Sequence, residues 1–197
     1  MFARRYRGAG IAALVIATGT VLAACTINIG TPDDDRDRGS GMMSDADSAD
    51  YDPADLMFAR MMIPHHQQAV DMSELAIEKS TDPEVLALAE QIRDAQTVEI
   101  ALMESWLDDA VVRMPMGDRM PMGGMLSDDE MTALEDATAA EFDRLYLEGM
   151  IDHHEGAIRM ARMILDSDNP EVQALGEAIV ESQTAEIELM KQMLGDD

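Results

Sequence analysis

The chain has 197 residues, a formal net charge of −26 at pH 7 and a single cysteine. Its acidity disfavours nucleic acid as a partner, because such binding depends on Lys and Arg neutralising phosphates. One cysteine excludes an internal disulfide, while 19 methionines are far above ordinary usage.

Residues 1–24 predict a signal peptide. Three arginines precede an apolar run that starts at Ile11 and ends at Leu22-Ala23-Ala24-Cys25. The run is shorter than the roughly 20 residues of a membrane-spanning helix, which argues against an uncleaved anchor. Its last four residues look like a bacterial lipobox, whose cysteine becomes lipidated. We therefore expect Cys25 to anchor an exported protein to the outer face of the bacterial cell membrane.

Residues 25–51 predict a lipidated cysteine followed by a disordered tether, because they are rich in Asp, Gly and Ser with little apolar content. Cleavage after residue 24 removes three arginines and no acids. The exported part then carries 11 basic and 40 acidic side chains, a formal charge of −29. This charge keeps a protein soluble and concentrates cations near it, but does not identify a cation.

Residues 52–197 contain two copies of one unit, which predicts a duplicated domain. A His/Met pattern recurs at a constant offset of 88, and a second pattern recurs at an offset of 87 after a one-residue gap. The first pattern is Met62, His65, His66, Ala69 and Met72, returning as Met150, His153, His154, Ala157 and Met160. The second includes Gln96, Glu99 and Met103, returning as Gln183, Glu186 and Met190.

Each copy predicts a helix, a turn and a second helix, and no segment indicates a strand. Three pairs supply an N-cap followed by proline at the first helical position: Asp52-Pro53, Asp82-Pro83 and Asn169-Pro170. Between the copies, residues 127–130 form a capping box that begins an extra helical segment at about Asp128. Whether this segment continues into the helix bearing His153 is open from the sequence.

A helical wheel centred on His65 places both histidines of the first pair inside a wide apolar arc, with Met62, Ala69 and Met72 close to His65. The second copy has the same layout around His153. An arc this wide indicates a helix packed by neighbours on two sides. The prediction is an all-α four-helix bundle built from two repeated helical hairpins.

The second helix of each copy carries polar residues where its core stripe predicts apolar ones. These residues are Gln96, Glu99, Gln183 and Glu186. A buried carboxylate needs a partner, because leaving it unpaired is costly in free energy. The histidine pairs across the bundle are the expected partners.

All four histidines lie in the two pairs, with methionine on the same helical face, and this pattern predicts a soft-metal site. Neutral imidazole is the commonest protein metal ligand, and its combination with thioether favours Cu(I). Adjacent helical residues point about 100° apart, so we expect His65 and His153 nearest the bundle axis. His66 and His154 would then ligate at a neighbouring site or support the ligands. The alternative is that all four are hydrogen-bonded core residues. The predicted ligands are Met62, His65, His66, Met72, Met150, His153, His154 and Met160, with Gln96, Glu99, Met103, Gln183, Glu186 and Met190 as auxiliary residues.

A methionine-rich linker, residues 108–126, joins the two copies. Its methionines lie among prolines and glycines that prevent helix packing. The linker is either a flexible thioether arm that captures Cu(I) or a hydrophobic loop on the bundle, and soft-donor chemistry favours the arm. Elsewhere methionine is expected to fill gaps in the core, as at Met163 and Met193. The arm carries Met114, Met116, Met120, Met122 and Met125.

The stretches 58–72 and 142–157, with Met-Ile-Pro-His-His and Met-Ile-Asp-His-His at their centres, resemble the signature of the domain-of-unknown-function 305 family. The resemblance covers about Asp52 to Leu194. It implies a ferritin-like four-helix bundle in exported bacterial proteins, some of them associated with copper binding and resistance. It does not imply an established enzymatic activity. Asp152 stands where proline often precedes the second pair, and Gly149 where a bulkier residue is common. A looser or more open second site is therefore expected.

The prediction is an exported, lipid-anchored protein that sequesters or transfers Cu(I) without catalysis, with an unidentified donor or acceptor protein. One alternative is a ferritin-like di-metal oxidoreductase. Such enzymes carry Glu-x-x-His on two helices, but Met62, Ile63, Met150 and Ile151 stand three residues before the histidines. Another is a structural or interaction lipoprotein without metal. Hydrolytic and nucleotide-dependent functions rank low, because the chain shows no nucleophile with a base, phosphate loop or dinucleotide fingerprint.

Overall fold

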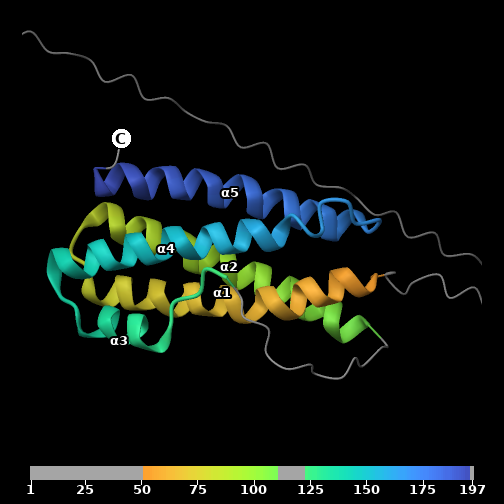
Figure 1. Cartoon of the computed structure of the whole chain (residues 1–197), viewed down its shortest axis with the longest axis horizontal. Helices are drawn as coiled ribbons and strands as arrows, with labels where there is room; N and C mark the ends of the chain where they lie inside the picture. The colour runs from red at the N-terminus through yellow and green to blue at the C-terminus, as the bar shows by residue number, and fades with distance from the viewer. Residues whose placement is uncertain (1–50, 111–122, 196–197) are drawn as a thin grey trace, which may run out of the picture. The chain divides into compact units, whose positions relative to one another are not determined.

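A computed structural model of the protein describes residues 51–110 and 123–195. Within these ranges the chain forms five helices and no strand, so the all-α prediction is confirmed. The helices are α1 (Pro53–Lys79), α2 (Pro83–Asp109), α3 (Asp128–Asp136), α4 (Ala139–Ala161) and α5 (Pro170–Leu194) (Figure 1). None of them is long and apolar enough to cross a membrane. The predicted signal peptide, the lipidation site at Cys25 and nearly all of the tether lie outside the described residues.

Local signals in the sequence explain where the helices begin. The Asp52 carboxylate accepts hydrogen bonds from two amides of the first turn of α1, at 2.6 and 3.0 Å. Asp82 and Asn169 cap α2 and α5 in the same way, so that each cap satisfies amides that have no partner inside the helix. The extra segment is a separate helix, because α3 ends at Asp136 and extended backbone follows at Ala137 and Thr138.

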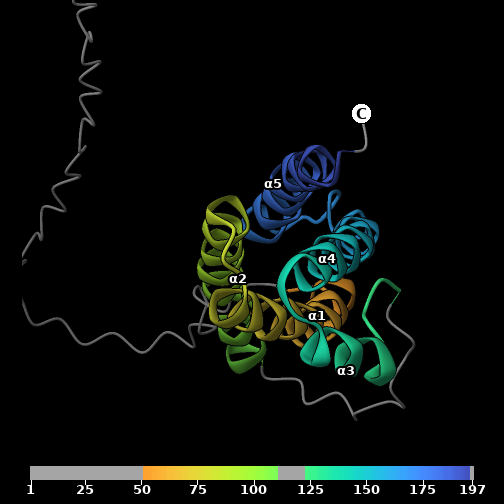
Figure 2. The same ribbon diagram turned by 90° about the vertical axis from the view of Figure 1, so that its left-hand side faces the viewer.

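The helix α1 packs against both α2 and α4, and α4 packs against α5. The central helices α1 and α4 run in opposite directions (Figure 1), and α3 lies beside them at the edge of α4 (Figure 2). Side-chain hydrogen bonds join α2 to α5, from Gln91 to Glu186 at 2.8 Å and from the Trp106 indole to Glu171 at 3.2 Å. Each long helix is therefore connected to two others.

The hydrophobic core consists of two clusters separated along the helices. One cluster takes residues 69–76 of α1 and 142–150 of α4, and the other takes 58–62 of α1 and 157–161 of α4. The histidine pairs lie between the clusters on both helices. Because α1 and α4 are antiparallel, Met62 shares a cluster with Met160, and Met72 shares the other with Met150.

Candidate metal centre

His65 and His153 lie against each other between the two core clusters. Their ring centroids are 3.8 Å apart, the ring planes are inclined by 42°, and both residues are 0% exposed. The helical wheel places both histidines toward the bundle axis, and the packing of α1 on α4 brings them together. We call this pair the histidine contact.

His66 and His154 point toward the outer helices. Nε2 of His66 lies 2.7 Å from a carboxylate oxygen of Glu99 on α2, and Nε2 of His154 lies 2.8 Å from Glu186 on α5. Both rings are fully buried, while the Glu99 and Glu186 side chains are 18% and 10% exposed. The core glutamates thus have the histidine partners that the sequence suggested. In the tautomer that donates Nε2–H to the carboxylate, Nδ1 carries the free lone pair.

The four histidines form a layer across the bundle, and many of their buried ring nitrogens have no hydrogen-bond partner. Within the described ranges, both ring nitrogens of His65 and of His153 and the Nδ1 atoms of His66 and His154 make no hydrogen bond. Both amide atoms of Gln96 and the Gln183 amide oxygen are also buried without partners. A buried polar atom left in this way costs about 1–3 kcal/mol, and native structures contain few of them. A ligand bound in this layer would satisfy these atoms and remove their cost in free energy.

Burial keeps the histidine contact uncharged. Burial, with a smaller contribution from the neighbouring His66, lowers the pKa of His65 from 6.5 to about 3. The nearby Gly123 carbonyl opposes this lowering of the pKa without making a well-formed hydrogen bond to the ring. Burial also lowers the pKa of His153 well below 6.5, with His65 contributing. Both rings are neutral at pH 7, which is the form that binds metal ions.

Methionines from both copies flank the histidine contact. Met62, Met72 and Met150 are 0% exposed, and Met160 is 9% exposed. Met72 reaches across to α4, because its Cε lies 3.5 Å from the position of a Cβ added to Gly149. Each flank of the contact therefore has one thioether from each copy. Met103 and Met190, the predicted auxiliary methionines, are also fully buried, one in each core cluster.

Hard ligands do not form a site of their own in residues 51–110 and 123–195. No three His, Cys, Asp or Glu side chains in these ranges converge closely enough to hold a metal ion. A carboxylate-rich di-iron centre needs several such groups, and this part of the chain does not provide it. The imidazoles of the histidine contact and the thioethers in the adjoining core clusters are soft donors, which suit Cu(I) better than Mg²⁺, Ca²⁺ or Mn²⁺.

Only part of the predicted linker site can be placed. Met114, Met116, Met120 and Met122 lie outside the described residues. Met125 is partly buried and lines a cavity of about 440 Å³ between α3 and α4.

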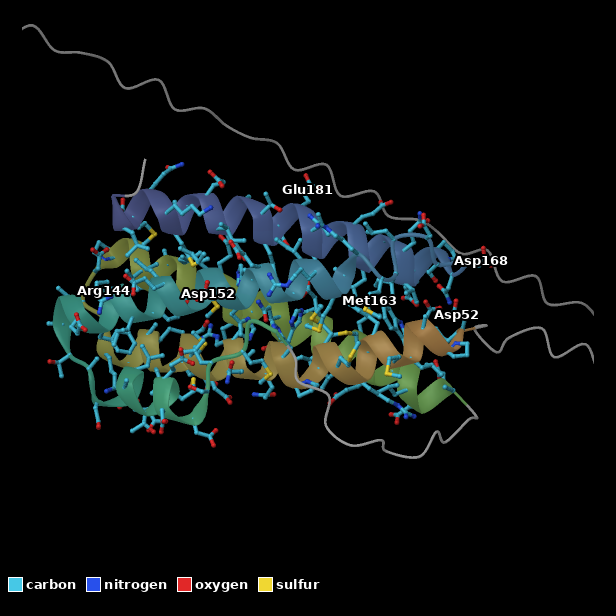
Figure 3. The ribbon with its side chains drawn as sticks, in the orientation of Figure 1. Asp52, Arg144, Asp152, Met163, Asp168 and Glu181 are labelled. Atoms are coloured by element: carbon cyan, nitrogen blue, oxygen red, sulfur yellow. The ribbon has the colours of Figure 1, made fainter. Side chains whose placement is uncertain are left out.

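Met163 does not fill the core, contrary to prediction. It is 52% exposed beyond the end of α4 (Figure 3), because the helix stops at Ala161 and the chain turns at the surface. Met193, as expected, is partly buried against the core.

The segment Gly123–Leu126, which we call the strap, lies beside the histidine contact and was not expected there. The Gln68 side chain donates to the Leu126 carbonyl at 2.9 Å and accepts from the Leu126 amide at 2.8 Å. Across from Gln68, the Gly123 carbonyl oxygen lies only 2.1 Å from the position of a Cβ added to Gly156 on α4. The sequence signals were the Gly123-Gly124 pair and a glycine inside a helix, neither of which is periodic.

The two histidine pairs are equally buried, and the second copy differs in having a cavity beside Gly149 and Asp152. His153 is buried as fully as His65, and the two rings form one contact rather than two separate sites. Gly149 on α4 and Gly124 in the strap allow the two segments to approach closely. Leu126 lies 3.1 Å from the position of a Cβ added to Gly149, and the Asp152 carbonyl lies 2.6 Å from one added to Gly124.

These features define a class of all-helical proteins in which two repeated hairpins bring paired histidines into a buried layer flanked by methionines. The chain belongs to the family described as Domain of unknown function (DUF305), whose family model matches residues 55–194. No curated protein sequence matches the chain.

Several solved structures are similar to this chain. A DUF305 protein from Streptomyces coelicolor, described as a candidate secreted protein, is 35% identical with a TM-score of 0.69, over 73% of this chain and 93% of that one. A DUF305 fragment from Deinococcus radiodurans is 33% identical with a TM-score of 0.67, over 73% and 97%. CopM in its Cu(I)-bound form is 36% identical with a TM-score of 0.61, over 72% and 96%. CopM is also known in Cu(II)-bound, Ag-bound and apo forms.

Proposed function

We propose that this protein binds Cu(I) at the histidine contact. The observation that carries the proposal is that His65 and His153 meet in a buried layer with all four ring nitrogens unpartnered. Both rings are neutral, so their lone pairs are available to an ion without loss of a proton. The ligand set would be completed by the flanking thioethers of Met62, Met72, Met150 and Met160.

The solved relatives support this choice of metal. CopM, which is 36% identical to this chain, has structures with Cu(I), Cu(II) and Ag bound. Silver and Cu(I) share a preference for soft ligands, as the imidazole and thioether donors of this chain require. We therefore assign Cu(I) as the ion carried by this protein.

The outer histidines hold the layer in position. The bonds to Glu99 and Glu186 fix the tautomers of His66 and His154, and a carboxylate on one nitrogen makes the other a better donor. Their Nδ1 atoms are buried without partners, so they are auxiliary ligands for an ion in this layer. Gln96 and Gln183 precede Glu99 and Glu186 by three residues on the same helices, and we assign them an auxiliary role as well.

Within this proposal the protein sequesters or transfers copper and catalyses no reaction. It is exported and lipid-anchored through Cys25, and the relative described as a candidate secreted protein supports a location outside the cytoplasm. Its copper donor or acceptor is a separate protein. The ferritin-like description is also proposed, with α1, α2, α4 and α5 as the four bundle helices and α3 as an addition.

A structural role is the second candidate, because His66 and His154 do make the hydrogen bonds to glutamate that such a role predicts. The test is an anaerobic Cu(I) titration of residues 26–197 against a chromophoric chelator. We expect saturable binding that H65A/H153A weakens far more than H66A/H154A does. Affinity unchanged in H65A/H153A would refute the proposal. Binding that survives loss of all four histidines would assign copper to the linker methionines, and no binding would favour the structural role.

A further inference from the structure

We infer that the strap is the wall between a solvent-facing cavity and the histidine contact, and that Gln68 holds this wall closed. Opening of the strap then sets how fast an ion reaches and leaves the contact. The part of the inference that concerns the ion rests on the proposed function. The attachment of the strap by Gln68 can be tested without metal.

The strap has a cavity on one side and the histidines on the other. The cavity of about 440 Å³ is lined by Met125 and Leu126 of the strap and by Gly149 and Asp152 of α4. On the inner side, the strap contacts Gln68, three residues after His65, and Gly156, three residues after His153. A fully buried site needs an opening for exchange with solvent, and this thin segment lies at the required place.

Gln68 is the clamp. It lies one helical turn after His65, and its amide makes two hydrogen bonds to the backbone of Leu126, at 2.9 and 2.8 Å. A single side chain thus satisfies both polar backbone atoms of one strap residue. The neighbouring Gln67 is exposed and bonds to Asp71 on its own helix at 2.9 Å, so it provides a matched control.

The strap packs on α4 at Gly156, a contact that we call the seat of the strap. A methyl group there would overlap the Gly123 carbonyl, so an alanine cannot coexist with the strap in its present place. Glycine inside a helix is unfavourable relative to alanine. Gly124 has a φ of +98°, a conformation that L side chains rarely adopt. The seat therefore depends on glycine on both of its faces.

The outer side of the wall is suited to cations. Four acidic residues, Glu130, Glu148, Asp152 and Glu155, and one basic residue, Arg159, line the cavity together with the partly buried thioether of Met125 (Asp152 is labelled in Figure 3). Arg144 neutralises Glu148 at 2.5 Å, whereas Arg159 is 3.9 Å from Glu155. Acidic side chains around a cavity raise the local concentration of cations. An ion gathered here needs to pass only the strap.

The experiment compares Q68A with Q67A in the full chain and adds G156A. Hydrogen exchange at the Leu126 amide, in metal-free protein, is expected to be at least about tenfold faster in Q68A, because that amide loses its acceptor. Stopped-flow transfer of Cu(I) to a chelator should accelerate about tenfold, with the equilibrium affinity changed less. G156A should behave like Q68A and remain folded, since alanine favours the helix. Q67A should match the wild type in both measurements.

Unchanged exchange at Leu126 in Q68A would overturn the assignment of the clamp. Faster exchange at Leu126 in Q68A and G156A, combined with wild-type rates of Cu(I) transfer, would overturn the role of the strap in access. Failure of the proposed function looks different, because the wild type itself would then bind no Cu(I). That result would also overturn the role in access, while the exchange data would still decide the clamp.

Discussion

Replacing both residues of the histidine contact by leucine is expected to stabilise the metal-free protein. His65 and His153 bury four ring nitrogens without partners. An unsatisfied buried atom costs at least about 1 kcal/mol of folding free energy. Removing all four nitrogens therefore stabilises the protein by about 4 kcal/mol. Imperfect packing of leucine and loss of the ring contact subtract about 1–2 kcal/mol. We expect H65L/H153L to raise the free energy of unfolding by about 2–3 kcal/mol.

The outer histidines provide a control with the opposite sign. H66L/H154L removes the hydrogen-bond partners of Glu99 and Glu186, whose side chains are only 18% and 10% exposed. Glu186 keeps its hydrogen bond from Gln91. Loss of the histidine partner from a largely buried carboxylate is nevertheless destabilising, by at least about 1 kcal/mol. The two double variants change the same residue types in one layer, so general effects of adding leucine cancel in the comparison.

The assay is urea unfolding followed by circular dichroism at pH 7.5 with a copper chelator present. If the slope of the free energy of unfolding against urea concentration is unchanged, the substitution alters stability alone. Repeating the experiment with Cu(I) should stabilise the wild type by about 2.7 kcal/mol at a free concentration one hundred times Kd. Cu(I) should not stabilise H65L/H153L. If metal-free H65L/H153L is less stable than the wild type, the histidine contact is structural and the reasoning fails.

Two further predictions concern the titration of the contact and its thioethers. The folded pKa values of His65 and His153 are depressed, so their contribution to stability is present above the unfolded value of 6.5 and is lost as pH falls toward about 3 for His65. At pH 5 the loss is about 2 kcal/mol for each histidine whose folded pKa stays below 5, and urea unfolding of H65L/H153L should lack it. M62L/M160L should weaken Cu(I) binding at least about tenfold and, like the control M193L, change stability by less than about 1.5 kcal/mol. Equal affinity of M62L/M160L and M193L would exclude thioether ligation on that flank.

The helices and their starting points could be read from the sequence because their signals are local. The N-caps at Asp52, Asp82 and Asn169 bind amides within one helical turn. The helical periodicity around each histidine shows which face of its helix the histidine occupies. The Glu99 and Glu186 partners followed from a physical requirement, since a carboxylate in a core stripe must be paired. These inferences needed no knowledge of which helices are neighbours.

The shared histidine contact and the strap could not be predicted, because both depend on tertiary packing. A helical wheel gives the direction of His65 but does not say that α4 lies opposite with its chain reversed. The strap depends on Gly123, Gly156 and Gln68, whose separation in sequence shows no repeat. Met163 is exposed rather than core-filling because α4 ends before it, at Ala161.

The antiparallel packing of α1 and α4 explains why the duplication matters for function. One hairpin alone supplies one central imidazole and two thioethers, on opposite sides of that imidazole along the helix. Packing the second copy in reverse places His153 on His65 and puts one thioether from each copy on each flank. An ion at the contact is then shared equally by the two copies, and we expect one such ion per chain. The strap has no counterpart in this symmetry, because it comes from the linker between the copies. Under the proposed function, the duplicated halves supply the ligands, and the unduplicated linker supplies the strap that we infer to control access to them.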